Sequence, residues 1–211
     1  MTNVAWSLLV VAAVWAVGNW SAVALRLKPL EYVAKPATMV ALLGVALTLS
    51  PHVDARRWAF VVAIVFSLLG DVFLMIPADL FVAGLSSFLL AHVAYIVGLR
   101  IAAPGVRPLV FSAIPVVVVA ALIGSRVLGS VRERRPELAG PVAAYIGVIS
   151  VMVAAALATG EPLAAFGGVS FMVSDALIAW NRFVVPLEWA PVTIMVTYHV
   201  AQALLVLSLG L

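Results

Sequence analysis

The chain has 211 residues, of which 65% are hydrophobic and 10% are charged, and its formal net charge is +3 at pH 7. Soluble domains carry about 25% charged residues, so this composition excludes a water-solvated fold and predicts an integral membrane protein. The absence of cysteine excludes disulfides, thiolate metal sites and cysteine nucleophiles. The basic residues are expected mainly in short loops near lipid phosphates, and they do not indicate a nucleic-acid partner.

Apolar runs of about 20 residues predict eight transmembrane helices. They cover residues 4–25, 36–51, 58–76, 81–100, 108–126, 139–159, 162–182 and 187–209. Because the connections are short, residues 1–211 are expected to form a single integral-membrane domain, an all-α polytopic transmembrane helical bundle. Pro36 suits the first turn of the second helix, which would leave Lys35 at the membrane edge. His52, beside Pro51, is expected in a solvated loop.

Basic residues predict the orientation of the chain in the membrane. The odd-numbered connections hold Arg26, Lys28, Lys35, Arg126, Arg132, Arg134, Arg135 and Arg182, and the even-numbered ones hold Arg56, Arg57, Arg100 and Arg107. The positive-inside rule therefore places the odd-numbered connections in the cytoplasm and both termini outside it. The scarcity of lysine among the basic residues, together with abundant Ala and Val, favours a bacterial host and hence a bacterial plasma membrane.

Four ionisable residues interrupt the apolar spans: Asp71, His92, Asp175 and His199. Each ionisable side chain at bilayer depth costs about 2.5–3.5 kcal/mol on insertion scales, so such residues usually mark chemistry or transport. In the predicted topology all four lie within roughly 10 Å of a common depth, in the cytoplasmic half of the bilayer. The sequence therefore predicts one shared polar pocket. The alternatives are an Asp that pairs with a cation as a structural strut and a His that packs in the core.

Other polar residues occupy similar depths and are expected to supply the hydrogen bonds that a buried carboxylate or imidazole requires. They are Asn19, Tyr95, Ser174, Asn181, Tyr198 and Gln202, with Lys35 at the mouth of the pocket. Ser174 lacks the G-x-S-x-G context of a nucleophile, so hydrogen-bonding support is its expected role.

Small residues and residue spacing predict how the helices pack. The seventh and fourth predicted helices carry small side chains that allow close helix approach, namely Gly167, Gly168, Ser170 and Ser174, and Gly84, Ser86 and Ser87. Asp71 and Asp175 are separated by about half the chain, as are His92 and His199. This spacing is compatible with a parallel internal repeat in which the third and fourth helices correspond to the seventh and eighth, although the two halves otherwise look dissimilar.

Two carboxylates in a low-dielectric pocket do not ionise alike, so one is expected to stay protonated as an acid while the other remains an anion. That pair can catalyse acid-assisted hydrolysis. Two His and two Asp residues on four helices have no diagnostic metal spacing. From the residues alone, an enzyme and a proton-coupled transporter are almost equally favoured. Matching broken helices, which a transporter needs, are not evident.

Three local strings resemble the YhhN family of membrane proteins, whose characterised members are lysoplasmalogenases. They are GDVFLM at residues 70–75, FVAGLSSFLLAHVAY at 81–95 and GGVSFMVSDALIAWN at 167–181, preceded by Lys35-Pro36. The resemblance covers most of the chain, including the eight-span layout. It implies that Asp71 and Asp175 are catalytic, with His92, Ser174 and Asn181 as further motif members. His199, Tyr95, Tyr198 and Asn19 are expected around them.

The resemblance implies hydrolysis of the vinyl ether bond of a lysoplasmalogen, which releases a fatty aldehyde and glycerophosphoethanolamine or glycerophosphocholine. Lys35 is then expected to meet the lipid head group at the membrane face. No cofactor and no metal are expected. The family has also been grouped with zinc-dependent ceramidases, but this chain lacks their H-x-x-x-H pair in the final helix. A zinc-dependent lipid hydrolase and a transporter remain the alternatives.

Overall fold

A computed structural model describes residues 2–49 and 53–210, so the predicted loop position of His52 lies outside the described residues. Within these two ranges the chain forms eight long α-helices and no β-strand. The helices are α1 (Asn3–Ala24), α2 (Lys28–Thr48), α3 (Asp54–Met75), α4 (Phe81–Ala102), α5 (Val106–Arg134), α6 (Ala139–Ala158), α7 (Pro162–Phe183) and α8 (Ala190–Leu207). Each of them is long and apolar enough to cross a membrane, which confirms the predicted all-α polytopic bundle.

Two predicted helix boundaries are wrong. The second helix begins at Lys28, not at Pro36, because Pro29 occupies its first turn and Lys28 forms an ion pair with Glu31 at 2.7 Å on the helix surface. Pro36 therefore lies inside α2 and leaves one backbone hydrogen bond unmade. The fifth helix continues to Arg134, so most of the charged segment after Arg126 is helical. In both places the charged residues had been interpreted as part of a loop.

The exposed surface of the bundle is apolar. Large hydrophobic side chains on α5 are strongly exposed, with Phe111 at 70%, Leu122 at 68% and Ile114 at 58%. An apolar surface of this size is unfavourable in water and suits lipid. The membrane environment thus follows from the structure as well as from the composition.

Small residues allow the helices to approach one another, as the sequence predicts. A Cβ atom added to Gly167 would lie 3.1 Å from the backbone nitrogen of Leu205 in α8, and one added to Gly168 would lie 2.9 Å from Ala156 in α6. On α4, a Cβ atom at Gly84 would lie 2.5 Å from the side chain of Leu74 in α3. These glycines permit close packing of α7 and of the α3–α4 hairpin.

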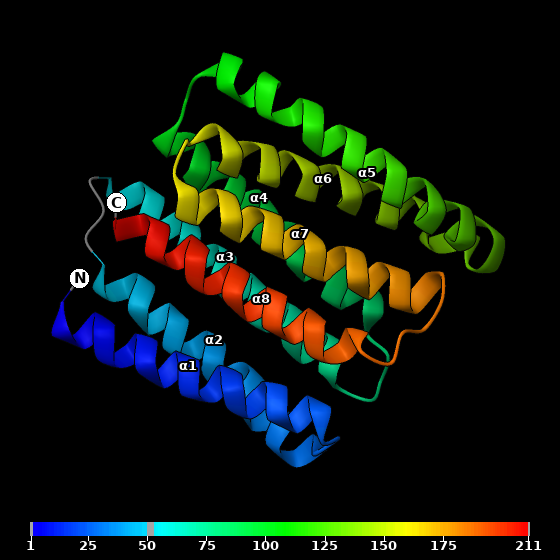
Figure 1. Ribbon diagram of the computed structural model, residues 1–211, viewed down its shortest axis with the longest axis horizontal. Helices are drawn as coiled ribbons and strands as arrows, with labels where there is room; N and C mark the ends of the chain where they lie inside the picture. The colour runs from blue at the N-terminus through cyan, green and yellow to red at the C-terminus, as the bar shows by residue number, and fades with distance from the viewer. Residues whose placement is uncertain (1, 50–52, 211) are drawn as a thin grey trace.

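The helix arrangement follows the expected repeat, with one departure. Figure 1 shows the α1–α2 and α5–α6 hairpins on opposite sides of the bundle, with α3, α4, α7 and α8 between them. Across the halves, α4 packs on α6 and α8 packs on α2, as a two-fold repeat requires. The departure is in the outer helices, because α1 packs on α8 whereas α5 packs on α7.

Candidate active site

Asp71 lies in the last turn of α3, where both of its carboxylate oxygens have partners. Lys35 Nζ lies 3.0 Å from Oδ1, and the Tyr198 hydroxyl donates a hydrogen bond of 2.7 Å to Oδ2. The side chains of Lys35 and Asp71 are only 8% and 1% exposed. The three groups come from α2, α3 and α8, and they form what we call the Asp71 cluster. Both donors can stabilise a carboxylate at this position, and we assign Asp71 as the anion of this cluster.

The position of Lys35 corrects the expectation that it stands at the membrane edge. Since α2 begins at Lys28, Lys35 lies two turns inside the helix, and its ammonium group is committed to Asp71. Lys35 had been expected at the mouth of the pocket, because it was interpreted as the residue before a shorter helix. The structure gives Lys35 a buried carboxylate partner in place of an exposed lipid phosphate.

Asp175 lies in α7 and has a different environment, in which two donors meet at a single oxygen. The Tyr145 hydroxyl donates to Oδ2 at 2.5 Å, and His92 Nε2 lies 3.1 Å from the same oxygen. His92 Nε2 also lies 2.9 Å from the Tyr145 hydroxyl. Among the described residues, none hydrogen-bonds Oδ1. We call these three residues the Asp175 cluster.

The hydrogen-bond network indicates which ring nitrogen of His92 is the donor. Because the Tyr145 hydroxyl donates its proton to Asp175, its oxygen is an acceptor toward His92, and His92 Nε2 must carry a hydrogen. His92 Nδ1 is buried and has no hydrogen-bond partner among the described residues. His92 therefore acts on the cluster through Nε2, as a hydrogen-bond donor.

Tyr145 was not among the residues singled out from the sequence. It is a lone hydroxyl-bearing aromatic residue in the apolar stretch of the sixth helix. Its depth near the start of α6 is similar to that of the acids, and this is the signal that sequence reasoning had available.

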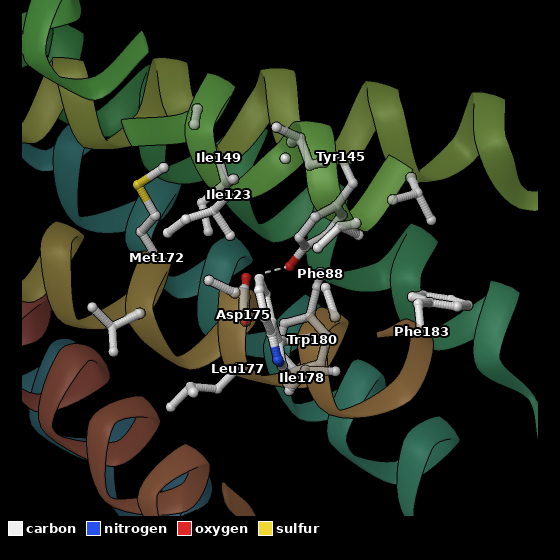
Figure 2. Close-up of a pocket in the computed structure, with 18 of the residues that line it drawn as sticks. Phe88, Ile123, Tyr145, Ile149, Met172, Asp175, Leu177, Ile178, Trp180 and Phe183 are labelled. Carbon is white, nitrogen blue, oxygen red and sulfur yellow. Dashed lines mark hydrogen bonds between the residues drawn. The ribbon is translucent and has the colours of Figure 1, made fainter. Parts of the chain in front are cut away.

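The Asp175 cluster stands on the wall of an apolar cavity of about 380 Å³. The cavity is enclosed mainly by α4, α5, α6 and α7, and Figure 2 shows Asp175 and Tyr145 in contact at its wall among hydrophobic side chains. Asp175 is the only acidic residue among the described residues that line it. α5 packs on α7, and both helices contribute side chains to the lining.

The two acids do not line this cavity together, which corrects the expectation of one shared chamber. Asp71 is absent from the described lining, and aromatic rings lie between the two clusters. The Phe171 ring is centred 4.7 Å from His92 and 5.5 Å from Tyr198, and Phe88 lies 5.8 Å from Tyr198. Sequence depth placed the acids at one level, but the rotation of the helices gave each acid its own partners.

Ser174 and Asn181, two motif residues, stabilise the ends of α7 and α8. The Ser174 hydroxyl donates to the carbonyl of Ile194 in α8 at 3.1 Å. Asn181 Oδ1 accepts a hydrogen bond of 2.7 Å from the backbone N–H of Leu187, in the turn between the two helices. The structure therefore places neither side chain on Asp175, and both hold the hairpin that positions it.

The remaining predicted residues lie on α1, α4 and α8, and two hydrogen bonds connect α1 and α4 to α8. Trp20 Nε1 donates to His199 Nδ1 at 3.1 Å, and the Tyr95 hydroxyl donates to Gln202 Oε1 at 2.5 Å. Asn19 is fully buried, and neither atom of its amide has a hydrogen-bond partner among the described residues. His199 is thus held by α1 and does not contact either carboxylate directly.

The structure also bears on the zinc alternative. In the part of the chain that the structure describes, no group of three or more His, Cys, Asp or Glu residues is close enough to hold a metal ion. The donors are divided between the Asp71 cluster, which has a single carboxylate, and the Asp175 cluster, which has one carboxylate and one imidazole. Neither donor set matches a three-ligand catalytic zinc site.

Comparison with known proteins identifies the family. The sequence profile of the YhhN family matches residues 30–209. The chain belongs to the YhhN family. The matched range contains the Asp71 and Asp175 clusters completely, and it leaves out Asn19 and Trp20 of α1. The resemblance seen in the sequence motifs is thus confirmed over most of the chain.

Several relatives in this family carry a named activity. The chain is 34% identical over 216 residues to a lysoplasmalogenase of Mycobacterium tuberculosis, which covers 90% of this chain and 81% of the relative. It is 34% identical over 146 residues to human lysoplasmalogenase TMEM86B, which covers 69% of this chain and 61% of the human protein. Human lysoplasmalogenase TMEM86A is 33% identical over 168 residues, or 74% of this chain and 66% of that protein. No solved structure matches the chain significantly.

Proposed function

We propose that this YhhN-family protein is a membrane-embedded lysoplasmalogenase, which hydrolyses the vinyl ether bond of lysoplasmalogens in a bacterial plasma membrane. The observation that carries the proposal is the placement of Asp175. Its Oδ2 is held by Tyr145 and His92, while Oδ1 has no protein partner among the described residues, at the wall of an apolar cavity. The activity of the relatives supports the same substrate class.

The chemistry needs one proton donor close to an alkene. A vinyl ether hydrolyses when an acid protonates the alkene carbon distal to the ether oxygen, which produces an oxocarbenium ion. Water adds to the cationic carbon and loses a proton, and the resulting hemiacetal collapses to a fatty aldehyde and the glycerophospholipid alcohol. A protonated Asp175 gives its proton from Oδ1 in the first step and, as a carboxylate, accepts the proton of the attacking water in the second.

The contacts divide the work between the two acids. Asp71 has both oxygens occupied by Lys35 and Tyr198, so it has no free position from which to transfer a proton to substrate. We therefore assign proton transfer to Asp175, and we assign to Asp71, through its ion pair with Lys35, a fixed dipole beside the site. A preorganised charge in a water-poor site acts strongly on a developing charge.

The cavity accounts for the apolar part of the substrate. The alkenyl chain carries no hydrogen-bonding group beyond its ether oxygen, and the described cavity lining is almost entirely hydrophobic. Figure 2 shows Ile123, Ile149 and Met172 near the acid, where an alkyl chain would replace lipid contacts with protein contacts.

The test is fatty aldehyde release from synthetic lysoplasmalogen by the purified protein. We expect Asp175→Asn and Asp71→Asn each to abolish release while the folded protein still purifies. Asp54→Asn is the matched control, because Asp54 is 74% exposed and pairs only with Arg57 in the first turn of α3. Wild-type protein that releases no aldehyde but drives proton-coupled flux in proteoliposomes would replace this proposal with the transporter.

A further inference from the structure

A second, polar pocket of about 200 Å³ lies next to the apolar cavity. It is formed where the α3–α4 turn meets the ends of α5 and α7. Its lining consists of the end of the α3–α4 connection, the first turn of α4 and three residues from the other helix ends, namely Asp79, Leu80, Phe81, Val82, Ala83, Arg135, Leu138 and Arg182. Two guanidinium groups and one carboxylate therefore converge on one small pocket, which we call the Arg182 pocket.

The charged groups of the Arg182 pocket are partly engaged and accessible. Arg182 Nη2 lies 2.9 Å and 3.2 Å from the two carboxylate oxygens of Asp79, and the side chains are 34% and 67% exposed. Arg135 Nε lies 2.6 Å from Glu137, and its side chain is 55% exposed. A guanidinium has five N–H donors, and each of these two arginines uses only one nitrogen on a carboxylate. Both retain donors for an anion.

Backbone and ring contacts hold the pocket in place. Asp79 has a φ of 45°, in the left-handed region that a non-glycine residue seldom adopts, and this conformation accompanies its contact with Arg182. The Arg182 guanidinium also lies 4.1 Å from the centre of the Phe81 ring, and Phe81 meets Phe183 edge to face at 5.6 Å. A strained residue of this kind persists where its surroundings fix it.

Phe81 joins the polar pocket to the apolar cavity. Its side chain lines both of them. Arg182 follows Asp175 by two helical turns in α7, so it lies on the same face of the helix and roughly 10 Å nearer the membrane surface. In a lysoplasmalogen the glycerol backbone lies between the vinyl ether and the charged phosphate group. The two pockets therefore match the two ends of such a molecule.

We propose that the Arg182 pocket binds the zwitterionic head group of the lipid, with Arg182 and Arg135 on the phosphate and Asp79 on the ammonium group. This inference rests on the proposed function and deepens it. It moves the head group away from Lys35, whose ammonium is buried against Asp71. It also explains why opposite charges are gathered in one pocket, since the head group carries both. Guanidinium groups suit phosphate because they offer paired donors in one plane.

The activity test compares three vinyl ether substrates with the same chain: alkenyl-glycerophosphoethanolamine, alkenyl-glycerol 3-phosphate and alkenylglycerol. We expect Arg182→Gln to lower kcat/KM for the two phosphate-bearing substrates by roughly ten- to a hundredfold, the range of charged hydrogen bonds, and to leave alkenylglycerol unchanged. We expect Asp79→Asn to lower kcat/KM only for the ethanolamine substrate. Arg182→Lys, which keeps the charge, should recover part of the loss.

The control is Arg126→Gln, an exposed arginine in α5 that is not among the residues lining either pocket. Equal losses for all three substrates in Arg182→Gln would mean that Arg182 only supports Phe81, and would overturn the proposal. A loss no larger than that of Arg126→Gln would overturn it as well.

A binding measurement separates this proposal from the proposed function. The saturated ether 1-alkyl-glycerophosphoethanolamine has no alkene to protonate, and its Kd is measured by calorimetry in detergent. We expect a roughly ten- to hundredfold weaker Kd for Arg182→Gln and an unchanged Kd for Arg126→Gln. If the wild type releases no aldehyde but shows this difference, only the vinyl ether activity fails. If aldehyde is released and the Kd is insensitive to Arg182, only the head-group site fails.

Discussion

The buried ion pair of Lys35 with Asp71 gives the sharpest prediction for stability. Substituting Lys35→Met leaves the Asp71 carboxylate 1% exposed with the Tyr198 hydroxyl as its remaining partner. At the observed 3.0 Å and an effective dielectric constant of about 20, the lost attraction is about 5.5 kcal/mol. Removing one partner of a buried pair costs 3–5 kcal/mol in typical measurements. We therefore expect unfolding free energy to fall by about 3–5 kcal/mol and Tm by roughly 6–20 °C.

The assay is thermal unfolding in one detergent, with two reference variants. Lys28→Met removes a cation whose side chain is 64% exposed and should cost less than about 1 kcal/mol. The double variant Lys35→Met with Asp71→Asn removes both buried charges and should recover most of the lost stability. We expect it to be folded and inactive. A Lys35→Met protein as stable as Lys28→Met would refute the ion-pair reasoning, and an active double variant would make Asp71 a structural strut.

Three further predictions test the rest of the site and the packing. Tyr145→Phe removes the hydroxyl that holds Asp175 at 2.5 Å, and it should lower kcat roughly ten- to a hundredfold with little change in KM; a rise in KM at constant kcat would contradict this role. Gly167→Ala places a Cβ atom 3.1 Å from a backbone nitrogen of α8, so we expect the free energy of unfolding to fall by about 1–3 kcal/mol. Gly147→Ala is the control, because its added Cβ atom would have nothing within 4 Å, and it should be neutral or stabilising. Equal effects of the two variants would refute the packing argument. Chelator treatment should leave aldehyde release unchanged, and inhibition that zinc reverses would support the metal-dependent alternative.

The positions of the acids and their helices were predictable because hydropathy is a sum over consecutive residues. An acid within an apolar run is conspicuous, and its distance from the helix end gives its depth. The same reasoning failed at Lys35, because a charge at a helix end and a charge buried two turns inside the helix produce similar sequence patterns. A lysine has a long apolar stem, so it can lie inside a helix and still reach a carboxylate on a neighbour.

The separation of the two acids into different clusters was not predictable, because partner choice depends on helix rotation. Helices of soluble proteins reveal their buried face through apolar residues that recur every three to four positions, but these helices are apolar on nearly every face. Tyr145 and His92 meet Asp175 from α6 and α4, and Tyr198 meets Asp71 from α8. Nothing local in the sequence distinguishes these pairings from the alternatives.

The sequence by itself determined that this chain is a membrane protein, how many helices can cross the bilayer, and which acids interrupt these helices. Each of these follows from the local cost of placing residues in hydrocarbon. The tertiary structure alone decided that Asp71 is neutralised by Lys35 and that Asp175 faces a cavity with one oxygen free of protein partners among the described residues. It did so through helix packing, in which α4, α5, α6 and α7 line the space that Asp175 faces. Helix packing depends on many contacts between residues that are distant in the sequence, so no single segment predicts it.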